Sequence, residues 1–160
     1  MEDMGFIEKL VDLVNNFDPA SFIPEVTTLF GWVESFCRLC VLAAPAGLLF
    51  FGLWYLLLPP KEANHSAGYR FYFGMGSVEA WRFTQRLAGI VLSAVGLILG
   101  VVMFLIAGDF RGMDMMVMAD RTVECLLWEL AVIVACIVII DLVVMIFFNW
   151  KGDRRWKKKK

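Results

Sequence analysis

The sequence predicts an all-α integral membrane protein with three transmembrane helices, preceded by an amphipathic N-terminal helical segment. Of its 160 residues, 60% are hydrophobic and 19% are charged, a balance far from that of a soluble domain. Residues 39–58, 87–107 and 126–148 carry few or no charges, and each run can cross about 30 Å of hydrocarbon as a helix. Strands are excluded because every backbone polar group in lipid needs a partner, and three strands cannot close a barrel.

Residues 1–38 are predicted to form the amphipathic segment. Apolar residues recur at helical spacing from Phe6 to Phe17. A second amphipathic stretch starts after Pro24 and is expected to run into the first membrane helix between Trp32 and Arg38. Because both stretches are acidic, packing against the protein is favoured over lipid contact. The acidic N-terminus also argues against a cleaved signal peptide.

The distribution of Lys and Arg predicts the orientation of the chain. Placing the C-terminus in the cytoplasm puts eleven of the 15 basic residues in the inner segments and four in the outer ones. Most acidic residues then lie outside, so the net charge of -1 hides two opposed charges separated by a bilayer. We therefore expect a multi-pass protein with its N-terminus outside.

The second and third apolar runs contain residues that need a structural explanation. Gly89, Ser93, Gly96 and Gly100 align on one helix face, which predicts close packing against another helix of the same chain rather than dimerisation. Asp141 lies inside the third run, so it should face the bundle and either find a polar partner or stay protonated. Proton or ion translocation through Asp141 is the alternative. Glu129 is nearer the outer end, where it could reach water.

The cysteines are predicted to be small buried thiols. A disulfide from Cys37 or Cys40 to Cys125 is the alternative. No metal site is expected, since His65 is the only histidine and a zinc site usually takes four ligands. No nucleophile and base converge, and no phosphate-binding loop occurs, so neither catalysis nor a cofactor is expected.

The loop of residues 59–86 carries the densest pattern of polar and turn-forming residues. It reads Pro-Pro-Lys-x-x-Asn-x-x-x-Gly-Tyr-Arg from Pro59, then Ser-x-Glu-x-Trp-x-x-x-x-Arg-x-x-Gly from Ser77. The prolines end the first helix, and Ser77 is a suitable N-cap for the second. Read without any family, the loop is a structural turn with Trp81 as an interfacial anchor.

This pattern resembles the SdpI family of small bacterial membrane proteins, which is named for an immunity protein against a sporulation-delaying toxin. The resemblance covers residues 59 to about 100, and Phe71 stands where threonine is usual. The motif or partner-binding residues that it implies are Asn64, Gly68, Tyr69, Arg70, Glu79, Trp81 and Arg86.

The resemblance implies a non-enzymatic protein of the bacterial inner membrane. Its expected role is immunity against a secreted, membrane-active peptide toxin, membrane signalling through a small cytosolic repressor, or both, without direct nucleic-acid binding. A structural or accessory subunit that packs into a larger membrane complex through its glycine face is the alternative from another class. Whether the chain forms a homo- or hetero-oligomer is left open.

The three-helix domain is expected to span residues 39–150 and to end in a polybasic cytoplasmic tail of residues 151–160. Arg154, Arg155, Trp156 and Lys157 are predicted to bind the anionic lipids of the inner leaflet, each base near the surface contributing about 1 kcal/mol.

Overall fold

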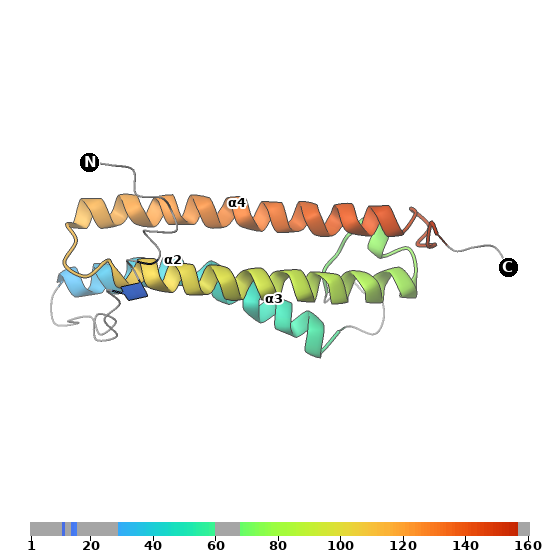
Figure 1. Cartoon of the computed structure of the whole chain (residues 1–160), viewed down its shortest axis with the longest axis horizontal. Coiled ribbons are helices and arrows are strands. Elements are labelled where there is room, and N and C mark those ends of the chain that lie inside the picture. Colours follow the sequence, from blue (N-terminus) through green and yellow to red (C-terminus); the bar gives the residue numbers. More distant parts are fainter. Residues whose placement is uncertain (1–10, 12–13, 16–28, 60–67, 157–160) are drawn as a thin grey trace. The chain divides into compact units, whose positions relative to one another are not determined.

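A computed structural model describes residues 11, 14–15, 29–59 and 68–156 of the chain. Three long helices dominate these ranges: α2 (Leu29–Leu57), α3 (Val78–Gly108) and α4 (Met115–Phe147) (Figure 1). A short 3₁₀ helix, η2 (Tyr72–Gly74), lies between α2 and α3. Each long helix is apolar enough to cross a membrane. The predicted all-α membrane class with three transmembrane helices is confirmed.

Each helix begins well before its apolar run and ends close to the predicted residue. The starts are Leu29, Val78 and Met115, against predicted starts at 39, 87 and 126. Hydropathy marks only the turns that fit in hydrocarbon, whereas the earlier turns are helical and carry polar residues. The predicted continuation of helix through Trp32 to Arg38 is confirmed. The amphipathic helix predicted from Phe6 to Phe17 lies mostly outside the described residues.

The chain divides into two compact units, and each long helix contributes to both. Among the described residues, unit 1 contains those up to residue 45 and residues 98–129, and unit 2 contains residues 46–59, 68–97 and 130–156.

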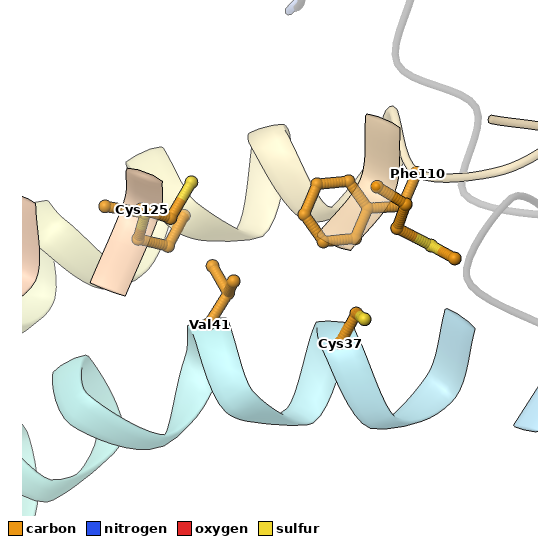
Figure 2. Close-up of a cluster of buried hydrophobic side chains, with 6 residues drawn as sticks. Cys37, Val41, Phe110 and Cys125 are labelled. Carbon is orange, nitrogen blue, oxygen red and sulfur yellow. The ribbon is translucent and has the colours of Figure 1, made fainter. Parts of the chain in front are cut away.

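Unit 1 is organised around a cluster of buried apolar side chains. In Figure 2, Cys37 and Val41 lie one turn apart on α2, on the side that faces Phe110 and Cys125. Met103 and Met118 complete the cluster. All four cysteines are free thiols; Cys37, Cys125 and Cys136 are buried as predicted, and Cys40 is partly buried. Neither alternative disulfide is formed.

The beginning of α4 is fixed by a local cap. The Asp114 carboxylate accepts a hydrogen bond from the Met116 N–H at 3.1 Å, which satisfies one of the free donors of the first turn. Just before it, Gly112 takes a φ of 75°, a left-handed conformation that glycine adopts at no steric cost. These two residues turn the chain from α3 into α4.

In unit 2, α2 and α3 approach closely along the predicted small-residue face. A Cβ added to Gly96 would lie 2.6 Å from the Leu49 backbone N, and one added to Gly89 would lie 2.7 Å from Leu56 Cγ. Gly52 of α2 likewise has no room for a side chain beside Ser93. Packing within the chain is therefore confirmed for these positions. Gly100, which belongs to unit 1, differs, because its added Cβ would make only an ordinary 3.8 Å contact with Pro45.

One stripe of α4 is buried, and most of the remaining surface of the helix is exposed. The buried side chains recur every three or four residues, as expected for one helix face. They are Met118, Thr122, Cys125 and Glu129 in unit 1, and Cys136, Ile140 and Val144 in unit 2. The expectation that Glu129 reaches water is wrong, because the carboxyl group belongs to this stripe.

Candidate functional site

The candidate site lies in unit 2, where the motif loop meets the first turns of α3. Gly68 adopts a φ of 112°, which L side chains rarely take. A Cβ at this position would also come within 2.7 Å of Trp81 Cζ2. The Trp81 side chain is fully buried, so the expectation of an interfacial anchor is wrong for this residue. Instead, Trp81 forms the surface on which the loop backbone rests.

Tyr69 is held to α3 by its backbone. The Tyr69 N–H donates to Gln85 Oε1 at 2.8 Å, and Gln85 Nε2 donates to the Tyr69 carbonyl oxygen at 2.7 Å. Gln85 is fully buried, so both halves of its amide are used where water cannot replace them. This pair of bonds fixes the direction in which the tyrosine side chain leaves the loop.

The Tyr69 side chain reaches α4. Its hydroxyl donates to Asp141 Oδ1 at 2.8 Å, which supplies the polar partner predicted for the intramembrane acid. Burial and the hydrogen bond to the Asp141 carboxylate raise the pKa of Tyr69 above its ordinary value, because both disfavour the phenolate. The phenol is therefore a permanent donor at neutral pH.

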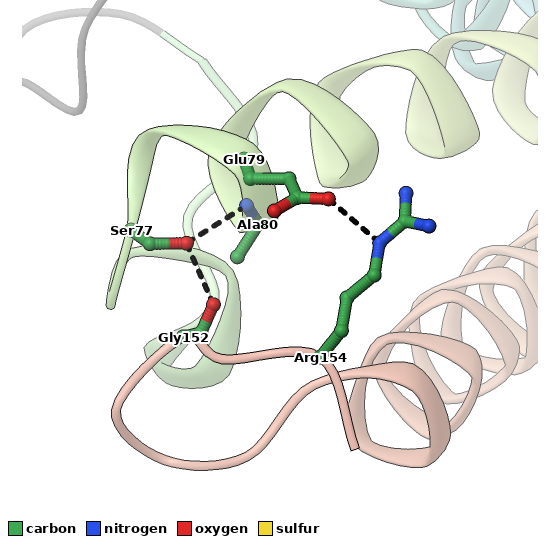
Figure 3. Close-up of polar contacts among 5 residues, drawn as sticks. All are labelled: Ser77, Glu79, Ala80, Gly152 and Arg154. Carbon is green, nitrogen blue, oxygen red and sulfur yellow. Dashed lines mark hydrogen bonds and ion pairs between the residues drawn. The ribbon is translucent and has the colours of Figure 1, made fainter. Parts of the chain in front are cut away.

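Ser77 joins the start of α3 to the chain that follows α4. Its Oγ accepts a hydrogen bond from the Ala80 N–H at 3.1 Å, which confirms the predicted N-cap. The same hydroxyl donates to the Gly152 carbonyl oxygen at 2.7 Å (Figure 3). A Cβ on Gly76 would lie 2.6 Å from the Gly152 N, so the two backbones touch.

Residues 148–155 fold back as a C-terminal hook. Asn149 Oδ1 accepts hydrogen bonds from the N–H groups of Lys151 and Asp153, at 3.0 and 2.8 Å. Figure 3 shows Arg154 of the hook beside Glu79 of α3, where Nε lies 2.8 Å from Glu79 Oε1. Because both side chains are about half exposed, this ion pair is weak, on the order of 1 kcal/mol or less.

The remaining predicted residues lie outside these contacts or at their edge. Arg70 and Arg86 are exposed, as is Arg82, one turn before Arg86. Trp156 is exposed, and Arg155 Nε donates to the Phe148 carbonyl oxygen at 3.2 Å. Asn64 and Lys157 lie outside the described residues. Arg154 and Arg155, predicted to bind lipid, thus both make contacts within the protein.

Sequence reasoning missed two elements of this site. Gln85 follows Trp81 by one helical turn, so the two side chains share a face of α3. An amide on the face of a large aromatic side chain could have indicated a buried hydrogen-bonding residue. Asn149, at the end of the last apolar run, was a second signal, since asparagine favours turns that bond their own backbone. No local pattern predicted the contact of Gly152 with Gly76, because those residues are distant in sequence.

The site consists of hydrogen bonds that hold segments of the chain together, and we call this set of bonds the fastening. Hydrogen bonds join the motif loop and the first turns of α3, which follow one another in the chain, to the end of α4 and its hook, which are distant in sequence. Among the described residues, no three metal-ligating side chains gather at one point. Exposed arginines, Arg70, Arg82 and Arg86, lie beside these hydrogen-bonded segments.

Comparison with known proteins agrees with the sequence pattern. The model of the SdpI/YfhL protein family matches residues 61–148, which include α3, α4 and the site residues from Gly68 to Asp141. No curated protein and no solved structure matches the chain.

Proposed function

The chain belongs to the SdpI/YfhL protein family, and we propose that it is a non-enzymatic immunity protein of the bacterial cell membrane. In this proposal it protects the cell against a secreted membrane-active peptide. It signals the presence of the peptide to a cytosolic partner through the motif loop.

The hydrogen bond between Tyr69 and Asp141 is the observation that carries this proposal. A plain connecting turn needs no bond from its tyrosine to an acid on α4, 72 positions further along the chain. This bond links the loop to α4, and the two hydrogen bonds between Gln85 and the Tyr69 backbone, the Gln85 clamp, link it to α3. A ligand that displaces α4 would therefore change the conformation of the loop through this bond.

The partner surface in this proposal consists of exposed arginines near the fastened loop. Arg70 leaves the loop next to Tyr69, and Arg82 and Arg86 share a face of α3. We place this surface in the cytoplasm, as the distribution of basic residues predicts. An acidic face of a small repressor is the complementary partner.

The accessory-subunit alternative has less support. It depended on the small-residue face of α3 being available to another protein. Gly89, Ser93 and Gly96 instead pack against α2 of the same chain. Translocation through Asp141 is also less favoured, because its carboxylate is engaged by Tyr69.

The test is protection of a sensitive bacterium that expresses the chain. Cells are challenged with the family's sporulation-delaying peptide and, separately, with melittin as an unrelated membrane-active peptide. We expect protection against the first peptide only. Tyr69→Phe should remove protection while leaving the amount of protein in the membrane unchanged, because it deletes one hydroxyl.

Arg121→Gln is the matched control, since Arg121 lies in unit 1 and forms only an exposed 3.8 Å ion pair with Glu124. It should protect as well as the native chain. Equal survival of cells with and without the native chain would contradict the immunity role. Full protection by Tyr69→Phe would contradict the role of the fastening.

A further inference from the structure

Glu129 is a buried acid that the candidate site does not use. It lies in unit 1, on the buried stripe of α4, and its side chain is 1% exposed. Neither carboxylate oxygen has a hydrogen-bond partner among the described residues. An ionised carboxylate in this position would lose its hydration and gain nothing in return.

The ion pairs described in unit 1 join groups other than Glu129. On α2, Arg38 forms an ion pair with Glu34. On α4, Arg121 pairs with Glu124, and Cys125 lies one turn from Glu129. In α3 no ionisable side chain occurs from residue 87 to residue 108. Within the described ranges, no cation forms an ion pair with Glu129.

We propose that Glu129 is a proton-binding site inside the membrane domain, held as a neutral carboxylic acid, and the selective site of modification by hydrophobic carbodiimides. The argument rests on burial and on the missing donors. A charged side chain buried in a membrane helix is costly, whereas a neutral acid avoids most of that cost. This inference is independent of the immunity role.

The modification consumes the bound proton. The carboxylic acid transfers its proton to one nitrogen of the carbodiimide, and its oxygen bonds to the central carbon to give an O-acylisourea. The acyl group then migrates to nitrogen and leaves a stable N-acylurea. All atoms of both reactants remain in the adduct. A carboxylate without its proton does not enter this sequence readily, so labelling reports the protonated state.

The experiment treats the whole chain in native membranes with dicyclohexylcarbodiimide and maps the adduct by mass spectrometry of peptides. We expect one adduct, on the peptide that contains Glu129, and its loss in Glu129→Gln. A water-soluble carbodiimide should leave Glu129 unlabelled, since it cannot enter the buried stripe. Asp141→Asn is the matched control and should keep the adduct.

Infrared spectroscopy gives a second reading that does not depend on reagent access. The C=O stretching band of a protonated carboxyl group should be present in the native chain and absent from Glu129→Gln. Labelling that persists in Glu129→Gln, or a native chain with neither the adduct nor the band, would overturn the proposal. Mapping on the native chain decides the question even where the variant fails to fold.

Discussion

Glu129 and Asp141 lie twelve positions apart in α4, and their surroundings are opposite in kind. In unit 2, Asp141 is partly buried and accepts a hydrogen bond from Tyr69 at 2.8 Å. In unit 1, Glu129 is more deeply buried, and within the described ranges its oxygens lack any donor. Asp141 therefore has a hydrogen-bond donor within the described residues, and Glu129 has none.

This difference shows that the depth of an acid in a membrane helix does not by itself fix its state. A carboxylate can remain charged where a donor is supplied, whereas an isolated one is better protonated. In unit 2 the donor to Asp141 comes from a loop, as the hydroxyl of Tyr69. Each of the following experiments changes one side of this comparison.

The largest effect should follow Glu129→Arg. A guanidinium stays charged at every accessible pH, so the protein can no longer relieve the site by binding a proton. We expect the free energy of unfolding in detergent to fall by about 3 kcal/mol or more, or no folded protein to accumulate. Glu124→Arg, at an exposed position on the same helix, should cost less than about 1 kcal/mol. Equal costs at the two positions would show that Glu129 is not buried.

Asp141→Leu should have the next largest effect. It removes the 2.8 Å acceptor of the Tyr69 hydroxyl and leaves only the Ile137 carbonyl oxygen at 3.5 Å, and the loss of a good acceptor by a partly buried donor costs about 1–3 kcal/mol. The measurement is thermal unfolding of the purified protein in mild detergent. Asp141→Asn keeps an acceptor oxygen and should recover most of the loss. If leucine proved as stable as aspartate, the bond in unit 2 would contribute nothing.

High pH should weaken the same bond. Because the pKa of Tyr69 is raised in the folded protein, the unfolded chain releases this proton first as pH rises above about 10. Stability from this group is complete below that pH and falls above it, by at most about 1.4 kcal/mol per pH unit. Unfolding measured on both sides of pH 10 should show a steeper loss in the native chain than in Tyr69→Phe. Parallel curves would contradict the raised pKa.

A double-mutant cycle tests whether Tyr69 and Asp141 stabilise the protein through their mutual hydrogen bond. Tyr69→Phe alone should cost about 1 kcal/mol, since the backbone clamp of Gln85 keeps the ring in place. Combined with Asp141→Ala, the two losses should be non-additive by about 0.5–1 kcal/mol. Strict additivity of the unfolding free energies would mean that the two side chains stabilise the protein independently.

Much of the fold could be predicted from the sequence because a membrane restricts the possibilities. Apolar runs located the three helices, and the spacing of Gly89, Ser93 and Gly96 located a helix contact. The helix starts could not be found from hydropathy, since charged residues interrupt the apolar signal in the first turns of α3 and α4, such as Glu79 and Arg82 in α3 and Asp120 and Arg121 in α4.

The candidate site was only partly predictable. The motif and the lone acid marked Tyr69 and Asp141 separately, but nothing in their spacing joined a loop to a residue 72 positions away. For Trp81 the local sequence was misleading. A tryptophan beside arginines is typical of a membrane interface, but in the fold the loop at Gly68 covers this side chain. The position of Glu129 near the end of an apolar run suggested contact with water. Its burial depends on how the helices pack, which the local sequence does not show.

The smallest effect, and the most diagnostic for the comparison, should follow Glu129→Leu. Replacing a buried polar group that lacks partners with an apolar one of similar size is often neutral or stabilising. We expect a change between zero and a gain of about 1 kcal/mol in the free energy of unfolding. The same replacement at Asp141 should destabilise, so the two leucine variants differ in sign. A clear loss in Glu129→Leu would reveal a partner for this acid and make the two sites alike.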